Sequence, residues 1–299
     1  MRATGSGSRE HTVPVADGVE LWARESGDPT GTPVLLVMGA ASSGVLWPDA
    51  LVERLGRRHR VVVWDHRDTG RSTRAVDVAP YELRDLAIDA VRVLDHLGVE
   101  RAHVVGMSMG GLLTQLLLLD HPDRVLSATL FCTGALAGAP GGEGLPGPHP
   151  DLLALWSRLG ETRDEDAEME FRVEHWQALA GAAIPFPREE VLALERGAVA
   201  HGGPADASSA TAHARAGTSG LDRGAELAGV RVPTLVVEAP EDPAYPPPTA
   251  RHLAGTIPGA RLVTVPGMGH ALPAAVLGPL GDALEEQFDS VDAANAANA

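Results

Sequence analysis

Residues 104–119 constrain the fold most, because an apolar segment there breaks at small residues and then becomes a long aliphatic stretch. This pattern predicts a buried strand, a sharp turn and a helix that is apolar on nearly all sides. The turn contains Gly106-x-Ser108-x-Gly110, which has the spacing of a nucleophile elbow. A serine in such a strained turn lifts its hydroxyl clear of the sheet, and the flanking glycines let strand and helix pass closely. Ser108 is therefore the candidate nucleophile.

The remainder of the chain alternates predicted strands with predicted helices. Two alternating segments around Asp17-Gly18 predict an antiparallel hairpin at one edge of the sheet. Continuous apolar strands are predicted at 33–38, 60–64, 125–131, 232–238 and 261–265, and an amphipathic helix at 83–97. With 299 residues, the chain is long enough for one large domain. The predicted fold class is α/β, with a mostly parallel central sheet flanked by helices.

Glycine and proline dominate residues 138–150, which interrupts this alternation and predicts a hinge into an insertion. The acidic segment that follows is predicted to be a helical lid, inserted after the sixth strand. Both ends of the chain are small and polar, and we expect them to be disordered. The predicted organisation is a core in two parts (11–134 and 228–289), a lid (135–227) and two tails (1–10 and 290–299).

Composition excludes several classes of partner. The formal net charge of −16 argues against nucleic acid and against an anionic membrane surface, since little here could neutralise rows of phosphates. No run of about 18 apolar residues occurs, and the first residues lack the apolar core of a secretory signal. Cys132 is the single cysteine, which excludes an internal disulfide and is interpreted as a small core residue. We expect a cytoplasmic protein whose oligomeric state, monomer or homo-oligomer, the sequence leaves open.

A carboxylate and a histidine follow the last two predicted strands. Asp242 comes after the strand at 232–238, and His270 comes after the strand at 261–265. With Ser108 they occur in the chain order serine, aspartate, histidine, which is one of the orders known for serine hydrolases. The sequence therefore predicts a catalytic triad in which Asp242 orients His270 and His270 activates Ser108.

Two glutamates compete with Asp242 for the role of the acid. Glu238 lies within the predicted strand, and Glu241 lies beside Asp242. Aspartate is the commoner choice and here precedes a turn-forming proline, so Asp242 is preferred.

A second group of charged residues follows the predicted strand at 60–64. We expect Asp65 and Arg67 to pair there and to hold the rim of a loop. His66 in this turn is a weaker candidate for the catalytic base than His270.

The loop after the strand at 33–38 consists of small residues, so a backbone amide could face the site there. Ala40 and Met109 are the predicted donors of an oxyanion hole, through their N–H groups. The histidines of the insertion do not show the spacing of metal ligands. We therefore predict no metal and no organic cofactor.

The elbow, Asp242, the segment Gly267-Met268-Gly269-His270 and the turn at 65–72 resemble the α/β-hydrolase superfamily. More narrowly, the chain resembles aclacinomycin methylesterase and related anthracycline-tailoring methylesterases. That resemblance rests on the segments 37–39, 64–72, 102–110 and 257–273. It spans residues 13 to 287 and is weakest across the lid.

The resemblance implies an α/β-hydrolase fold and a serine carboxylic-ester hydrolase acting on a small, apolar ester. The implied reaction removes a methyl ester from an anthracycline-type aromatic polyketide during antibiotic biosynthesis. A general carboxylesterase, a carbon–carbon bond hydrolase and a perhydrolase would use the same triad and stay open as alternatives. A catalytically silent ligand-binding protein is the alternative from another class, and an intact triad counts against it.

Overall fold

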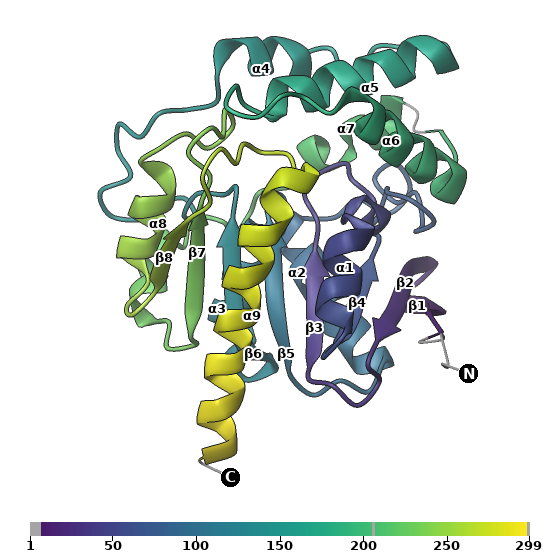
Figure 1. The fold of residues 1–299 in the computed structure, drawn as a ribbon. Helices are drawn as coiled ribbons and strands as arrows, with labels where there is room; N and C mark the ends of the chain where they lie inside the picture. Colours follow the sequence, from purple (N-terminus) through teal and green to yellow (C-terminus); the bar gives the residue numbers. More distant parts are fainter. Residues whose placement is uncertain (1–6, 205–206, 298–299) are drawn as a thin grey trace, which may run out of the picture.

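An eight-stranded sheet lies between two layers of helices in the computed structural model, which describes residues 7–204 and 207–297 (Figure 1). The strand order is β1-β2-β4-β3-β5-β6-β7-β8. Strand β2 is antiparallel to both β1 and β4, and the other neighbours are parallel. The mostly parallel sheet and its antiparallel edge hairpin are thus confirmed. The strands are β1 (Arg9–Ala16), β2 (Val19–Gly27), β3 (Pro33–Val37), β4 (Arg60–Trp64), β5 (Ala102–Met107), β6 (Val125–Phe131), β7 (Thr234–Glu238) and β8 (Arg261–Thr264).

In the described part of the chain, five helices cover the two faces of the sheet, and four more gather beyond one end of it (Figure 1). Helices α1 and α9 pack on one face, and α2, α3 and α8 pack on the other. The covering helices are α1 (Asp49–Gly56), α2 (Leu83–His96), α3 (Met109–Asp120), α8 (Thr249–Thr256) and α9 (Ala274–Ala297). The others, here called the lid helices, are α4 (Pro150–Trp156), α5 (Glu165–Leu179), α6 (Arg188–Gly202) and α7 (Ala207–Arg215), and they lie between β6 and β7 in the chain.

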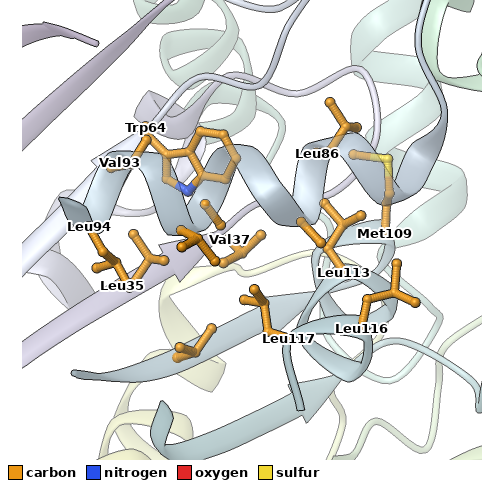
Figure 2. Close-up of a cluster of buried hydrophobic side chains, with 14 of the residues drawn as sticks. Leu35, Val37, Trp64, Leu86, Val93, Leu94, Met109, Leu113, Leu116 and Leu117 are labelled. Atoms are coloured by element: carbon orange, nitrogen blue, oxygen red, sulfur yellow. The ribbon is translucent and has the colours of Figure 1, made fainter. Parts of the chain in front are cut away.

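The central strands are continuous apolar runs because both of their faces are buried. In β3, Leu35 and Val37 face one layer of helices, whereas Val34 and Leu36 belong to the cluster on the opposite face. Figure 2 shows Val37 near Leu113 and Leu117 of α3, and Leu35 beside Leu94 of α2. Burying one such side chain contributes about 1.5–3 kcal/mol. This two-sided packing fixes the position of β5 and α3, and with them the turn that joins them.

The C-terminal segment differs from the predicted tail at 290–299. Helix α9 continues to Ala297, and residues 298–299 lie outside the described part of the chain. Val291 is buried, and Asp292 accepts hydrogen bonds from the Thr32 hydroxyl (2.9 Å) and from His103 (3.1 Å). These contacts, together with the high helix propensity of alanine, stabilise helix where the small-residue composition indicated disorder.

The N-terminal strand also begins earlier than expected. The tail was predicted to extend to residue 10, whereas β1 starts at Arg9. Residues 1–6 of that predicted tail lie outside the described residues. No helix in the described part of the chain is both long and apolar enough to cross a membrane.

Candidate active site

Ser108 sits in the turn between β5 and α3 with a φ of 57°, a left-handed conformation that is strained for a serine. The glycines on either side permit this turn. A Cβ on Gly110 would lie 2.0 Å from the Val37 carbonyl oxygen, and one on Gly106 would lie 2.4 Å from the Gly110 carbonyl oxygen. The helix therefore passes β3 at a distance that only glycine allows.

Asp242 and His270 meet at the ends of two neighbouring strands, β7 and β8. The Nδ1 atom of His270 lies 2.9 Å and 3.0 Å from the two carboxylate oxygens of Asp242, and both residues are buried. Asp242 also accepts hydrogen bonds from the backbone N–H groups of Ala244 (2.8 Å) and Tyr245 (3.0 Å). Burial opposes ionisation, but the His270 ring and these donors outweigh it and lower the pKa of Asp242.

Neither glutamate that competed for the acid role forms a hydrogen bond with His270 among the described residues. Glu238 forms a two-pronged ion pair with Arg251, at 2.6 and 3.0 Å, and accepts a hydrogen bond from the Thr264 hydroxyl. The backbone N–H of Glu241 donates to the Met268 carbonyl (2.9 Å), which ties the loop after β7 to the loop after β8. Asp242 is the carboxylate that contacts His270.

A second backbone contact connects the His270 loop to the lid helices. The N–H of His270 donates to the carbonyl of Leu179, at the end of α5, over 2.7 Å. Within the described residues, the Ser108 hydroxyl makes no hydrogen bond, so its bond to His270 is not formed in this state. Hydrogen bonds of catalytic groups commonly tighten only when substrate binds.

Two backbone amides lie near Ser108. Met109 is the first residue of α3, so its N–H has no acceptor within the helix and lies at the positive end of the helix dipole. A Cβ on Gly39 would lie 3.2 Å from the Ser108 Cβ, which places the loop after β3 directly beside the serine. Ala40 follows in that loop, and no acceptor among the described residues engages its N–H.

The prediction that Asp65 forms an ion pair with Arg67 is wrong. Arg67 forms a buried two-pronged pair with Asp89 of α2, at 2.6 and 2.8 Å. Asp65 instead accepts hydrogen bonds from the Ser43 hydroxyl (2.5 Å) and from the Gly44 N–H (2.8 Å). The two charges point in different directions, and Asp65 braces the loop after β3.

His66, the weaker candidate for the base, is completely buried. Its Nε2 donates to the Met38 carbonyl over 3.0 Å, and burial together with the nearby His213 lowers its pKa to about 3. Through this hydrogen bond to Met38, the His66 side chain holds the loop after β3. Sequence reasoning missed this bracing role, and the one signal for it was the unusual density of polar residues at 65–68.

Cys132, predicted to be a small core residue, is buried at the end of β6. Burial and the Asp242 carboxylate raise the pKa of its thiol, so the thiol stays protonated. Among the described residues, one group could hold a metal ion by distance alone. It consists of Cys132, Asp242 and His270, whose candidate ligand atoms all lie within 4.8 Å of one another. An ion there would require the Cys132 thiol, whose pKa is raised, to lose its proton first.

A cavity of about 610 Å³ opens between the lid helices and the sheet. Met107 and Ala271 line it, and they are the chain neighbours of Ser108 and His270. Its volume falls within the range of about 300–1,000 Å³ that is typical of small-molecule sites. The other apolar residues that line it include Met38, Leu46, Trp176, Phe186, Leu194 and Leu272.

Comparison with known proteins agrees with this geometry. Residues 32–273 match the model of the alpha/beta hydrolase fold family. The chain is 44% identical over 284 residues to the rhodomycin D methylesterases of Streptomyces peucetius and of Streptomyces sp. strain C5, covering 90% of this chain and 94% of each relative. The crystal structure of an esterase from Rhodococcus sp. ECU1013 superimposes with a TM-score of 0.78 at 21% identity, covering 94% of this chain and 99% of that one. The fold, the strained elbow and these relatives together place the chain in the α/β-hydrolase family.

Proposed function

We propose that this protein is a serine methylesterase that removes a methyl ester from an anthracycline-type aromatic polyketide. The observation that carries the proposal is the 44% identity, across 90% of the chain, to methylesterases named for rhodomycin D. The position of the Asp242–His270 pair on the same edge of the sheet as Ser108 supports it. An ester-hydrolysing enzyme with a small-molecule substrate follows from the family and these relatives.

In the proposed mechanism, His270 takes the proton of Ser108 as the hydroxyl attacks the ester carbonyl. Asp242 holds the imidazole with its proton on Nδ1 and stabilises the cation that forms. The N–H groups of Met109 and Ala40 stabilise the oxyanion, and each such donor is worth about 10²- to 10³-fold in rate. Methanol leaves with the proton from His270, and water then hydrolyses the acyl-enzyme with the help of the same histidine.

The cavity supports an apolar and sizeable substrate. Aliphatic and aromatic side chains from α1, the lid helices and the start of α9 line it, and it reaches the residues beside the reacting groups. A fused aromatic ring system would bury its faces against the apolar part of these walls. Every step uses side chains and amides of this chain alone. We place the reaction in the cytoplasm, in keeping with an unpaired, buried Cys132.

The test is mass spectrometry of products formed from a glycosylated anthracycline that carries a carbomethoxy group, with wild type and Ser108→Ala. We expect the wild type to replace the ester methyl by hydrogen and the variant to lose about 10⁶-fold in kcat. A simple p-nitrophenyl ester and an active-site phosphonate serve as controls for the triad.

The outcomes separate the alternatives. Turnover of the p-nitrophenyl ester alone would keep the triad and reject the polyketide substrate, leaving a general carboxylesterase, a carbon–carbon bond hydrolase or a perhydrolase. A folded wild type whose Ser108 neither turns over an ester nor reacts with the phosphonate would favour a ligand-binding protein.

A further inference from the structure

A histidine of the lid helices touches the loop that carries Ala40. The Nδ1 atom of His213, in α7, accepts a hydrogen bond from the N–H of Ala41 over 2.9 Å. Its Nε2 lies 3.0 Å from the Arg67 carbonyl, to which it donates. These two bonds fix the neutral ring with its proton on Nε2. His213 is buried, and burial lowers its pKa, so the acceptor on Nδ1 stays available.

The loop between Met38 and Ala41 depends on contacts of this kind. Ala41 has a φ of 53°, a left-handed conformation that alanine disfavours and that surrounding groups must therefore hold. His66 donates to the Met38 carbonyl on one side of Ala40, and His213 accepts from Ala41 on the other. The two histidine rings meet edge to face, with their centroids 5.7 Å apart. The Ala40 amide lies between two anchored neighbours.

A parallel contact joins α6 to the same region. His201 lies with its Nε2 2.7 Å from an oxygen of Asp65, whose other oxygen holds Ser43 and Gly44. Two lid helices thus each contribute one histidine that bonds to the turn after β4. That turn bonds to the loop after β3 through Asp65. Of the two, His213 is the one that bonds directly to the backbone next to Ala40.

We propose that His213 is a positioning residue that couples the seating of helix α7 to the orientation of the Ala40 N–H in the oxyanion hole. The inference rests on the proposed esterase function but not on the identity of the substrate. When α7 is seated, the Ala41 N–H is held, and with it the loop that carries the Ala40 N–H beside Ser108. When α7 withdraws, the loop loses the acceptor that holds Ala41 in its disfavoured conformation. The oxyanion donor is then complete only under a closed lid.

Two substitutions separate the two bonds of His213. In His213→Asn, the amide oxygen takes the place of Nδ1 and can still accept from Ala41, but the bond to the Arg67 carbonyl is lost. In His213→Gln, the amide nitrogen takes the place of Nε2 and can still donate to Arg67, but the Ala41 N–H loses its acceptor. Each variant removes one buried hydrogen bond and ring volume, so both should lower the melting temperature to a similar extent.

Steady-state hydrolysis of p-nitrophenyl acetate and the rate of Ser108 phosphonylation are the readouts, because both reactions place an oxygen in the same hole. We expect His213→Gln to lower kcat and the labelling rate by about tenfold or more, short of the about 10²- to 10³-fold that loss of a whole oxyanion donor costs. His213→Asn should keep both within about threefold, and KM should change little in either variant because the bound ester is held by other walls.

Equal losses in the two variants, or no loss in either, with wild-type turnover intact, would overturn the positioning role and leave His213 as a structural residue. A wild type that neither hydrolyses the ester nor reacts with the phosphonate would overturn the proposed function and the inference together. The two failures are therefore distinguishable.

Discussion

The sheet with its covering helices and the lid helices are held together by different forces. Around β3, β5 and α3 the buried contacts are apolar on both faces of the sheet, and Figure 2 shows those on the face covered by α3. Among the lid helices, the contact between α5 and α6 centres on a buried carboxylate, Glu195. It pairs with Arg172 (2.8 Å) and accepts from the Trp176 indole N–H (2.5 Å). The sheet is held by large apolar faces, whereas the lid helices combine a smaller apolar cluster around Leu152 and Leu179 with polar bonds such as those of Glu195.

This difference suits a rigid sheet that holds the proposed catalytic residues and a lid that opens to admit the substrate. A close-packed interior holds the strained turn at Ser108 in one conformation, since packed side chains leave it no room to relax. A lid over the proposed polycyclic substrate has to open for it, and a small apolar contact with a few polar bonds opens at a lower cost than a large apolar face. Four predictions test this comparison.

The largest effect is expected for Gly110→Ala in the elbow. The new methyl group would lie 2.0 Å from the Val37 carbonyl oxygen, so β3 or α3 must move. We expect a loss of about 3 kcal/mol or more in the free energy of unfolding, from overpacking of a rigid interior. Urea unfolding of wild type and variant measures it. A loss below about 1 kcal/mol would show that the elbow is more compliant than its packing indicates.

Glu195→Ala tests the lid. Arg172 and the Trp176 indole lose their shared acceptor in a mostly buried place, which costs about 2–3 kcal/mol locally. Because Trp176 lines the cavity, KM for a polycyclic ester should rise by about tenfold while kcat for a small ester stays within about threefold. The matched control is Glu189→Ala, an exposed acid at the start of the same helix. Equal effects of the two variants on KM would contradict the role of Glu195.

Acid should loosen the lid before the sheet. Burial, aided by the charges of His270 and Arg172, lowers the pKa of His175 in α5 to about 4. Burial likewise lowers the pKa of His103 in β5 to about 4. The unfolded chain binds these protons near pH 6.5 and the folded one only near pH 4, so stability present above pH 6.5 is lost as the pH falls toward 4.

Between pH 7 and pH 5 each of these histidines should cost about 2 kcal/mol. If the lid opens on its own, the protection factors of α5 amides, each referred to the intrinsic exchange rate at the same pH, should fall between pH 7 and pH 5 while those of β5 stay high. The variant His175→Gln should reduce this fall in α5. Simultaneous loss of protection in α5 and β5 would instead mean that lid and sheet unfold as one unit.

Those parts of the fold that depend on apolar periodicity could be predicted from the sequence. Strand β5, helix α3 and the edge hairpin around Gly18 follow from the spacing of apolar residues, which indicates burial on one face or on both. The roles of Ser108, Asp242 and His270, and of Ala40 and Met109, stay predictions. The structure brings Asp242 to His270 and sets Glu238 aside with Arg251.

What could not be predicted were the polar partners that lie far apart in the chain. Opposite charges at Asp65 and Arg67 indicated a local pair, but the pattern carries no information about Asp89, which only the packing of α2 brings near. The bond from Ala41 to His213 joins residues 172 positions apart. Polar contacts of this kind depend on the tertiary structure. The local spacing of apolar residues, by contrast, already indicates which face of a helix or strand is buried.

The smallest effect is expected for Gly197→Ala, the lid counterpart of the elbow substitution. Gly197 lies within α6, and a Cβ there would meet no atom within 4 Å. Alanine is a better helix former than glycine by about 0.5–1 kcal/mol, so the variant should be unchanged or slightly more stable in urea. The same chemical change thus has opposite signs in the two regions. If Gly197→Ala destabilised the protein as much as Gly110→Ala, the lid would be packed as tightly as the sheet, and the view that it opens through a few polar contacts would have to be abandoned.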